Sequence, residues 1–314
     1  MHLAIFLSLA VLCLIHAASS VEARPTTPSV IKLTKIDSAY WRATFSDPPL
    51  NLQGDAFFQD FYSIVDEITN NSDVKVVVFD SSSREFFSTH VDLINPLSHE
   101  LWPGNGRYWD CITRLAKAPV LTIAAIRGRA YNAGAEIAAA LDVRFGSKER
   151  AVLGQLEVGF GANPGGGGIE MLSRLTGRSR ALEIVLGSDV MDADTAALYG
   201  SDQHDKRNLT TVGINRAIPD ANFEKFVDSF ARRVAGWDHF AIATAKTLIN
   251  ERTGFATSEQ QQESFISFLA AASQGAVPVR LKAMARAGMQ KDLRFETRFS
   301  QEELRFVGNG PWRT

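Results

Sequence analysis

The sequence predicts an α/β fold in which a core of alternating helices and strands is followed by a helical C-terminal third. Apolar residues at helical spacing over residues 57–68 lead into an unbroken apolar run at 74–79, which has the composition of a buried parallel strand. The same helix-then-strand order recurs over residues 108–126 and again over 134–146. Beyond Pro164 strand patterns become scarce, so we expect mainly helices there.

The individual elements follow from local patterns. Residues 24–30 contain two prolines and predict a flexible lead, and residues 31–45 alternate polar and apolar side chains as an opening pair of strands does. In the core we expect helices at 57–68, 108–115 and 134–141 and strands at 74–79, 119–126 and 143–146. The later helices are expected at residues 169–175, 178–186, 193–199, 222–235, 239–250, 259–273 and 279–287.

Composition fits a globular domain and excludes some partners. The 314 residues are 45% hydrophobic and 22% charged, which is enough apolar material for a sizeable core. The formal net charge is −2 and the lysines and arginines are scattered, so no basic stripe for a nucleic-acid backbone is predicted. No His-x-x-x-His or Cys-x-x-Cys spacing occurs, so no metal site is predicted either.

The first 23 residues predict a signal peptide. An apolar run of about 13 residues at 3–15 precedes small residues at 16–23, which suits cleavage after Ala23 or, alternatively, at 18–20. The run is shorter than the roughly 20 residues that a membrane span needs, so we expect no span after cleavage and a location outside the cell or in the secretory lumen.

Two further features bear on the secretory route. Sequons at Asn70 and Asn208 are candidate N-glycosylation sites, although both also suit ordinary surface loops. Cys111 is the one cysteine left after cleavage, so the mature chain cannot form an intrachain disulfide.

Two glutamates in a glycine-rich stretch form the chemical centre of the sequence. Glu136 and Glu157 are followed by the glycines 165–168. Two carboxylates beside exposed backbone amides can move protons while the amides hold an oxyanion, as addition or elimination beside a carbonyl requires. The alternative is a helix-start charge at Glu136 and a solvated surface residue at Glu157. The glycines are not a nucleotide P-loop, because no Gly-Lys-Ser/Thr follows them.

An ordered series of motifs resembles the crotonase superfamily, the enoyl-CoA hydratase/isomerase family. The resemblance covers residues 31–287 and has no gaps over 117–187. Its motifs, in order, are Ala118-Pro119-Val120, Ala135-Glu136-Ile137, Gly154-Gln155-Leu156-Glu157, Pro164-Gly165-Gly166-Gly167 and Leu175-Thr176-Gly177-Arg178. It implies a ClpP/crotonase-like core of repeated ββα units at 31–190 and a helical trimerisation region at 191–287. A homotrimer or a dimer of trimers is therefore expected.

The same resemblance implies the site and the reaction. Glu136 and Glu157 would be the acid/base pair, with Glu157 mainly protonating the alpha carbon and Glu136 positioning the water. The oxyanion hole would use the backbone amides of Val91 and Ala133. Substrate-binding positions would be His90, Asp92, Gly134, Pro164 and Gly165. The expected reaction is hydration or isomerisation of an α,β-unsaturated acyl thioester, with coenzyme A as part of the substrate and no bound cofactor.

The chain also departs from the family pattern. His90, Asn132 and Ala133 stand where the family usually has glycine, so a narrower or reshaped oxyanion hole is expected. We expect His90 to line the substrate or to be structural, because no serine or cysteine elbow accompanies it. Residues 201–213 are a polar surface insertion or a retained intron, and the extension at 288–314 is expected to pack on a neighbouring subunit.

Two other functions remain open at this stage. The predicted leader conflicts with a thioester of coenzyme A, which favours a relative that acts on a free carbonyl compound, for example by carbon–carbon hydrolysis of a diketone. A catalytically silent secreted binding protein on the same fold is the third reading. The substitutions at His90 and Ala133 favour it, and the retention of both glutamates argues against it.

Overall fold

The computed structural model describes residues 28–95, 97–98, 106–198 and 213–307. The predicted signal peptide, the Asn208 sequon and residues 201–212 of the expected insertion lie outside the described residues. Asn70 is exposed at the C-terminal end of a helix.

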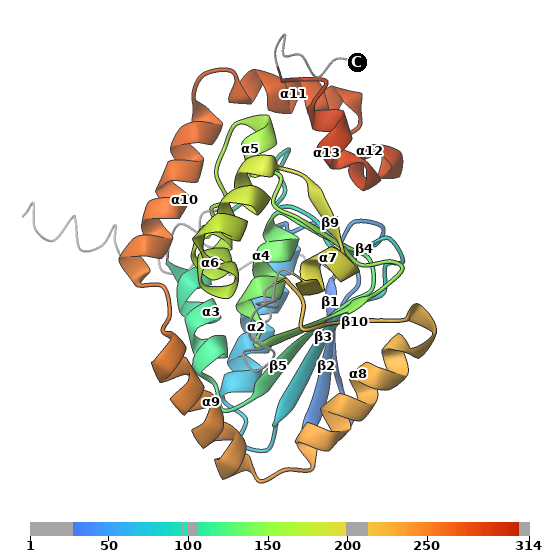
Figure 1. Cartoon of the computed structure of the whole chain (residues 1–314), viewed down its shortest axis with the longest axis vertical. Coiled ribbons are helices and arrows are strands. Elements are labelled where there is room, and N and C mark those ends of the chain that lie inside the picture. Colours follow the sequence, from blue (N-terminus) through green and yellow to red (C-terminus); the bar gives the residue numbers. More distant parts are fainter. Residues whose placement is uncertain (1–27, 96, 99–105, 199–212, 308–314) are drawn as a thin grey trace, which may run out of the picture.

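A mostly parallel sheet of six strands forms the lower half of the molecule (Figure 1). In spatial order its strands are β1 (Ile31–Lys35), β2 (Tyr40–Phe45), β3 (Val76–Ser81), β5 (Leu121–Ile126), β7 (Val143–Ser147) and β10 (Arg216–Ile218). Only β1 and β2 pair antiparallel, and they are the predicted opening pair. The predicted α/β core with a parallel sheet is confirmed.

Helices cover both faces of this sheet, which explains the unbroken apolar strand β3. Val77 and Phe79 pack on one side with α2 (Asp55–Thr69) and α3 (Arg107–Lys117). Val76 and Val78 pack on the other with α8 (Asp220–Ala235). Each of these helices presents an apolar stripe at helical spacing toward the sheet.

A second, smaller sheet lies above the first and was not predicted. It consists of β4 (Phe86–Ser88), β6 (Arg129–Tyr131), β8 (Val152–Gly154) and β9 (Val190–Asp192). The first three are parallel, and β9 runs antiparallel to β8. Two short helices, α4 (Ala133–Ala140) and α5 (Glu157–Phe160), carry the two glutamates.

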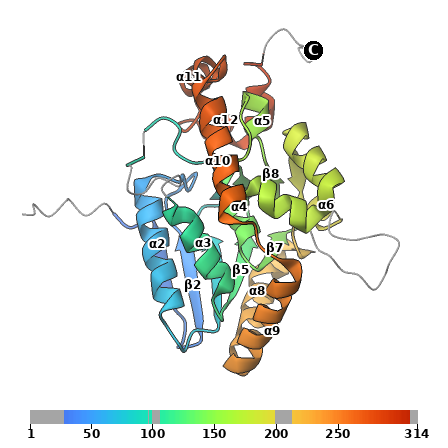
Figure 2. The same ribbon diagram turned by 90° about the vertical axis from the view of Figure 1, so that its left-hand side faces the viewer.

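The remaining helices surround these layers (Figures 1 and 2). They are α6 (Gly168–Gly187), α7 (Ala193–Leu198), α9 (His239–Thr253), α10 (Ser258–Ser273), α11 (Val277–Ala287), α12 (Leu293–Thr297) and α13 (Phe299–Glu303). The two helices expected at 169–175 and 178–186 are the halves of α6, which has non-helical backbone at Gly177. The last two helices were not predicted.

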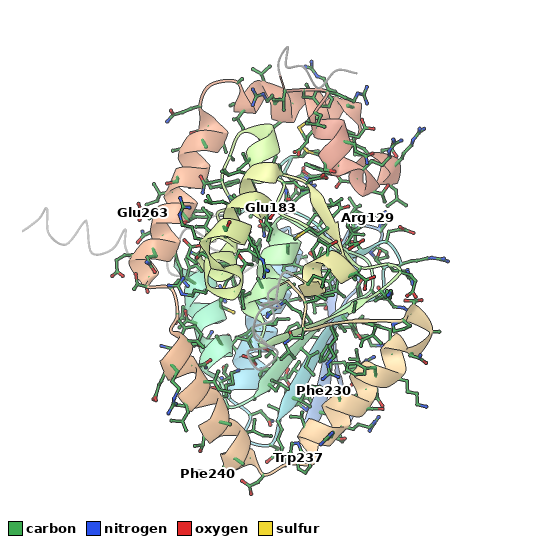
Figure 3. The ribbon with its side chains drawn as sticks, viewed as in Figure 1. Arg129, Glu183, Phe230, Trp237, Phe240 and Glu263 are labelled. Carbon is green, nitrogen blue, oxygen red and sulfur yellow. The ribbon has the colours of Figure 1, made fainter. Side chains whose placement is uncertain are left out.

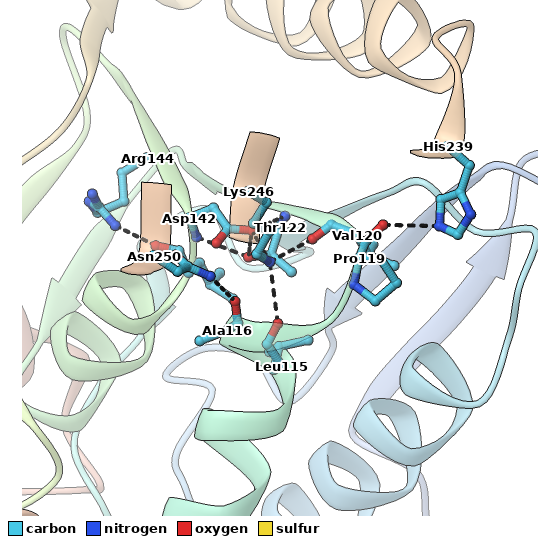
Figure 4. Close-up of polar contacts among 11 residues, drawn as sticks. Leu115, Ala116, Pro119, Val120, Thr122, Asp142, Arg144, His239, Lys246 and Asn250 are labelled. Atoms are coloured by element: carbon cyan, nitrogen blue, oxygen red, sulfur yellow. Dashed lines mark hydrogen bonds and ion pairs between the residues drawn. The ribbon is translucent and has the colours of Figure 1, made fainter. Parts of the chain in front are cut away.

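Helix α9 is attached to the core by its polar side chains (Figure 4). Lys246 Nζ contacts Asp142 Oδ2 at 2.7 Å and donates to the Val120 carbonyl at 2.7 Å, and Asp142 also accepts from Thr122. Asn250 Nδ2 donates to the Ala116 carbonyl at 3.0 Å. No residue of α9 is buried within the described chain, so these contacts rather than a packed apolar face hold the helix.

The described part of the C-terminal extension, residues 288–307, packs on its own chain. Its expected contact with a neighbouring subunit stays a prediction. Phe295 and Phe299 are buried in one cluster with Phe86, Leu156 and Phe160 of the core. Figure 1 shows α11 to α13 closing the end of the molecule above α5. Among the described helices, none has the length and apolar composition that crossing a membrane requires.

Candidate active site

A cavity of about 60 Å³ lies beside both glutamates. Its walls come from α2, α3, α4, α5 and α10 and the glycine turn at 165–166, together with His90, Val91, Leu93 and Leu97. The apolar part of the wall consists of Phe58, Leu93, Leu97, Phe160, Phe265 and Phe268. Glu136, Glu157, Val91 and Ala133 also line the cavity.

Glu136 lies in the first turn of α4 and is only 3% exposed. Its Oε1 accepts hydrogen bonds from the Gly166 amide at 2.8 Å and the Gly168 amide at 2.9 Å. Burial raises the pKa of Glu136 to about 7, although these two amides pull it downward. The glycine run therefore holds one carboxylate oxygen and leaves Glu136 able to change charge near neutral pH.

Glu157 is the first residue of α5 and is equally buried. Burial and the neighbouring charge of Glu136 raise the pKa of Glu157 well above its usual value. With its amide oriented to satisfy both groups, Gln155 donates to the two oxygens of Glu157 at 3.0 and 3.1 Å. Because each carboxylate disfavours ionisation of the other, the pair is suited to share a proton.

The amide of Val91 is directed away from its strand neighbour. The segment bridges Gln53 through the His90 carbonyl, which accepts from Gln53 N at 3.1 Å, and the Asp92 amide, which donates to Gln53 O at 3.0 Å. In such a parallel bridge the N–H of the middle residue points to the opposite side. Among the described residues the Val91 N–H has no acceptor, and Val91 lines the cavity.

The amide of Ala133 is the first of α4 and also lacks an acceptor among the described residues. Asn132, just before it, has φ 49° and ψ −120°, a backbone conformation that suits glycine better. The Asn132 amide donates to the Gly154 carbonyl at 2.8 Å, and Asn132 Oδ1 accepts from the Leu156 amide at 2.9 Å. The turn that leaves the Ala133 amide free is thus hydrogen-bonded directly to Leu156, the residue before Glu157.

The other predicted site residues divide into two groups. His90 and Gly165 line the cavity. Asp92, Gly134 and Pro164 do not. Asp92 caps the turn at 92–95 by accepting the Ile94 and Asn95 amides, and Gly134 lies against β4, where a Cβ would be 2.0 Å from the Ser88 carbonyl oxygen. Pro164 packs behind the glycine turn, within 2.8 Å of a Cβ placed on Gly168.

Several residues of the site carried no clear signal in the sequence. Tyr108 of α3 lines the cavity, and its hydroxyl donates to the Gly166 carbonyl at 3.3 Å. Phe265 and Phe268 come from α10, far along the chain. Gln155 could have been suspected, because it immediately precedes the second glutamate motif. Within the described part of the chain, no group of three or more His, Cys, Asp or Glu side chains could hold a metal ion.

Comparisons with known proteins agree with this arrangement. The sequence model of the family described as Enoyl-CoA hydratase/isomerase matches residues 36–264. The chain is 30% identical over 190 residues to the mitochondrial methylglutaconyl-CoA hydratase of Mus musculus, covering 60% of this chain and 58% of that protein. It is 27% identical over 194 residues to the short-chain-enoyl-CoA hydratase of Clostridium acetobutylicum, covering 60% and 68%. The chain thus spans less than two thirds of the mouse protein.

Solved structures extend the likeness over more of the chain. A candidate enoyl-CoA hydratase from Streptomyces avermitilis superposes with a TM-score of 0.79 and 34% identity, covering 89% of this chain and 98% of that one. An enoyl-CoA hydratase from Mycobacterium avium superposes with a TM-score of 0.69 at 19% identity, covering 82% and 96%, which supports the fold. The matched family model covers more than half of the chain, including both glutamates and both free amides, and the chain belongs to the enoyl-CoA hydratase/isomerase family.

Proposed function

We propose that the chain is a hydratase-like enzyme that adds water to an α,β-unsaturated acyl thioester, with isomerisation of the double bond as the related reaction of the same site. One observation carries the proposal. Two buried carboxylates, Glu136 and Glu157, face a cavity that also receives the acceptor-free amides of Val91 and Ala133.

The two amides would hold the thioester carbonyl oxygen. The positive end of the α4 dipole adds to the Ala133 amide, so charge that develops on this oxygen is stabilised. Water attacks the beta carbon, a C–O bond forms there, and the π electrons of the double bond move toward the carbonyl to give an enolate. The enolate then takes a proton at the alpha carbon, and the C=C bond has become a single bond.

The two carboxyl groups would divide the proton transfers. Glu157, whose pKa burial and the charge of Glu136 raise well above its usual value, holds the proton that goes to the alpha carbon. Glu136, with a pKa of about 7, orients the water and accepts its proton. The glycine amides at 166 and 168 hold Oε1 of Glu136, so Oε2 would be the oxygen that orients the water.

The cavity supports an acyl substrate. Its apolar part, formed mainly by phenylalanine and leucine side chains, suits the hydrocarbon portion of an acyl group. No cofactor is needed for this chemistry, because the amides and carboxylates supply the charge stabilisation and the proton transfers. Coenzyme A would enter as part of the substrate.

The test is turnover of short and medium enoyl-CoA thioesters by the purified chain starting at residue 24, followed as loss of the conjugated thioester absorbance. Glu157→Gln should lower kcat by about 10²- to 10⁴-fold, since it removes the proton donor while preserving shape. Glu67→Gln, an exposed position on α2 paired with Lys35, is the matched control and should retain wild-type turnover. Equal turnover by both variants would contradict the proposal.

The predicted leader is the observation that favours a second candidate, a thioester-free carbonyl substrate. We propose that the leader is removed and the chain enters the secretory route, where such a substrate would be accessible. N-terminal sequencing of the protein from its natural source decides the cleavage. Turnover of a diketone together with no turnover of any enoyl thioester would favour this candidate, and no turnover of either would favour a silent binding protein.

We also propose that the chain assembles as a homotrimer or a dimer of trimers. Phe240 of α9 is 79% exposed, Leu248 on the same side of the helix is 42% exposed, and Trp237 lies beside the start of this helix. Figure 3 shows Phe240 and Trp237 at the end of the molecule opposite α11 to α13. Such an exposed apolar face suits a subunit contact. Phe240→Ser should shift the mass measured by light scattering toward the monomer, whereas Glu251→Gln on the same helix should not.

A further inference from the structure

The C-terminal segment reaches into the active site through a buried histidine. His90 immediately precedes Val91 and is 2% exposed. Its Nδ1 lies 2.9 Å from the Val91 carbonyl oxygen, and its Nε2 lies 3.2 Å from Oε2 of Glu296 in α12. Glu296 is completely buried, so this contact connects two groups that are shielded from water.

A second set of contacts joins the same two segments. The Leu93 amide donates to Gln290 Oε1 at 3.0 Å, and Gln290 Nε2 donates to Asp92 Oδ1 at 2.8 Å. The backbone N–H of Gln290 also donates to Glu296 Oε1 at 2.6 Å. Both ends of the stretch around Val91 are therefore held by residues of the C-terminal extension.

The contacts of His90 indicate that it is a cation. Both ring nitrogens face oxygen acceptors, so each carries a proton when both hydrogen bonds form. The charged groups that face the ring are Glu296 of α12 and Asp92 of its own segment. Tyr131 of β6 lies close to Glu296, and the aromatic ring of Phe299 in α13 packs 5.6 Å from the imidazole.

The electrostatic balance agrees with the geometry. Burial lowers the pKa of His90, but the charge and hydrogen bond of Glu296, the Val91 carbonyl and the charge of Asp92 together raise it above its usual value. A buried carboxylate without this partner would be strongly disfavoured, so each ion requires the other. At neutral pH the site would then contain one positive charge next to the Val91 peptide.

We propose that His90, held as a cation by Glu296, is a positioning residue of the oxyanion hole that fixes the Val91 peptide and adds positive charge beside its amide. The proposal rests on the proposed function, because an oxyanion must form there for the charge to matter. A fixed cation in a dry pocket stabilises developing negative charge more than a mobile one in water would. It also gives a reason for a histidine where the family resemblance leads one to expect glycine.

The experiment compares Glu296→Gln, which keeps the shape but removes the charge, with Glu302→Gln, which removes an ion pair between Glu302 and Arg305 at the surface. The full chain is labelled with ¹³C-histidine, and His90 is assigned through a His90→Gln sample. We expect His90 to be doubly protonated at pH 7 in the wild type and in Glu302→Gln, and neutral in Glu296→Gln. We also expect kcat to fall about 10- to 100-fold in Glu296→Gln with KM changed less than about threefold.

Amide hydrogen exchange over residues 88–93 tests the positioning role without any substrate, and it should be faster in Glu296→Gln than in Glu302→Gln. A neutral His90 in the wild type at pH 7, or unchanged exchange in Glu296→Gln, would overturn the proposal. So would equal kcat in the two variants when the wild type is active. If the wild type turns over no enoyl thioester, the proposed function fails separately, and the titration and the exchange still decide the role of His90.

A second variant covers the case in which Glu296→Gln does not fold. Gln290 has φ 65°, which glycine adopts freely, so Gln290→Gly removes the contacts to Asp92 and Leu93 without backbone strain. We expect it to leave His90 doubly protonated, to speed exchange over 88–93 and to lower kcat. Wild-type exchange in this variant would overturn the positioning role of the C-terminal segment.

Discussion

The six-stranded sheet and the four-stranded sheet are stabilised in different ways. The first has strands of up to six residues whose apolar side chains pack against helices on both faces. The second has three-residue strands, and backbone approaches backbone closely: a Cβ at Gly128 would lie 2.7 Å from the Glu85 carbonyl oxygen. The buried Glu136 lies on α4, which packs against β4 and β6 of this second sheet. An added side-chain atom should therefore lower the free energy of unfolding much more in the small sheet than in the large one.

The largest effect on stability and turnover is expected from a substitution at Gly134. An alanine Cβ would lie 2.0 Å from the Ser88 carbonyl oxygen and 2.5 Å from its carbon, so β4 and α4 would have to separate. Since both contacts are to backbone, Gly134→Ala should lower the free energy of unfolding by at least about 3 kcal/mol. It should also abolish turnover, because Val91 and Ala133 lie on the two segments that would move apart.

The control is Gly187→Ala at the end of α6, where no atom lies within 4 Å of the added Cβ. This variant should be as stable as the wild type or more stable by up to about 1 kcal/mol, because alanine favours a helix. Urea denaturation of both variants measures the difference. A Gly134→Ala protein as stable as Gly187→Ala would contradict the view that the small sheet depends on close backbone contact.

The same contrast explains which elements could be predicted from the sequence. The strands β3 and β5 were predicted because apolar runs of six residues are long enough to show burial on both faces. The strands β4, β6 and β8 were missed because three residues show no period. The fold of the large sheet is thus encoded locally, and that of the small sheet is not.

For the site, several residues could be predicted from the sequence, but how deeply each is buried could not. Glu136, Glu157, Val91, Ala133, His90 and Gly165 were predicted through the family resemblance and all line the cavity. Asp92 was expected to bind substrate, yet its carboxylate accepts neighbouring amides instead, because a turn begins there. The role of Glu296 could not be predicted, since it contacts a residue 206 positions earlier and no local pattern reports such a contact.

An effect of intermediate size on the free energy of unfolding is expected at Glu303 of α13, a buried residue close enough to Glu157 to influence its pKa. Burial raises the pKa of Glu303 to about 9 from an ordinary value of 4.5, and a hydrogen bond from Ser188 offsets part of this. A raised acid pKa contributes stability below pH 4.5 that is lost as pH rises through 9, because the unfolded chain releases the proton first. Glu303→Gln stays neutral and should be about 3 kcal/mol more stable than the wild type at pH 7.

The pH dependence of the stability difference shows whether it arises from ionisation of Glu303 or from packing. Urea denaturation at pH 4.5 should give stabilities for the wild type and Glu303→Gln that differ by less than about 0.5 kcal/mol, since the wild-type carboxyl is then protonated in the folded chain and about half protonated in the unfolded chain. The difference should grow as pH rises. A constant difference at both pH values would mean that the amide packs differently against Gly159, whose Cβ position lies 2.1 Å from Glu303 Oε1.

The smallest effect on stability is expected at Asn132, where the backbone and the side chain pull in opposite directions. Glycine would relieve the strain of φ 49°, which is of the order of 1 kcal/mol, but would remove the hydrogen bond from the Leu156 amide, which is of similar size. Asn132→Gly should therefore change the free energy of unfolding by less than about 1 kcal/mol. Turnover should nevertheless fall several-fold, because Leu156 precedes Glu157 and the lost bond is what connects the oxyanion turn to the acid. Full turnover would show that backbone shape alone determines the geometry of the site, as it does at Gly134. Reduced turnover at unchanged stability would show that the asparagine side chain provides a hydrogen bond to Leu156 that glycine cannot.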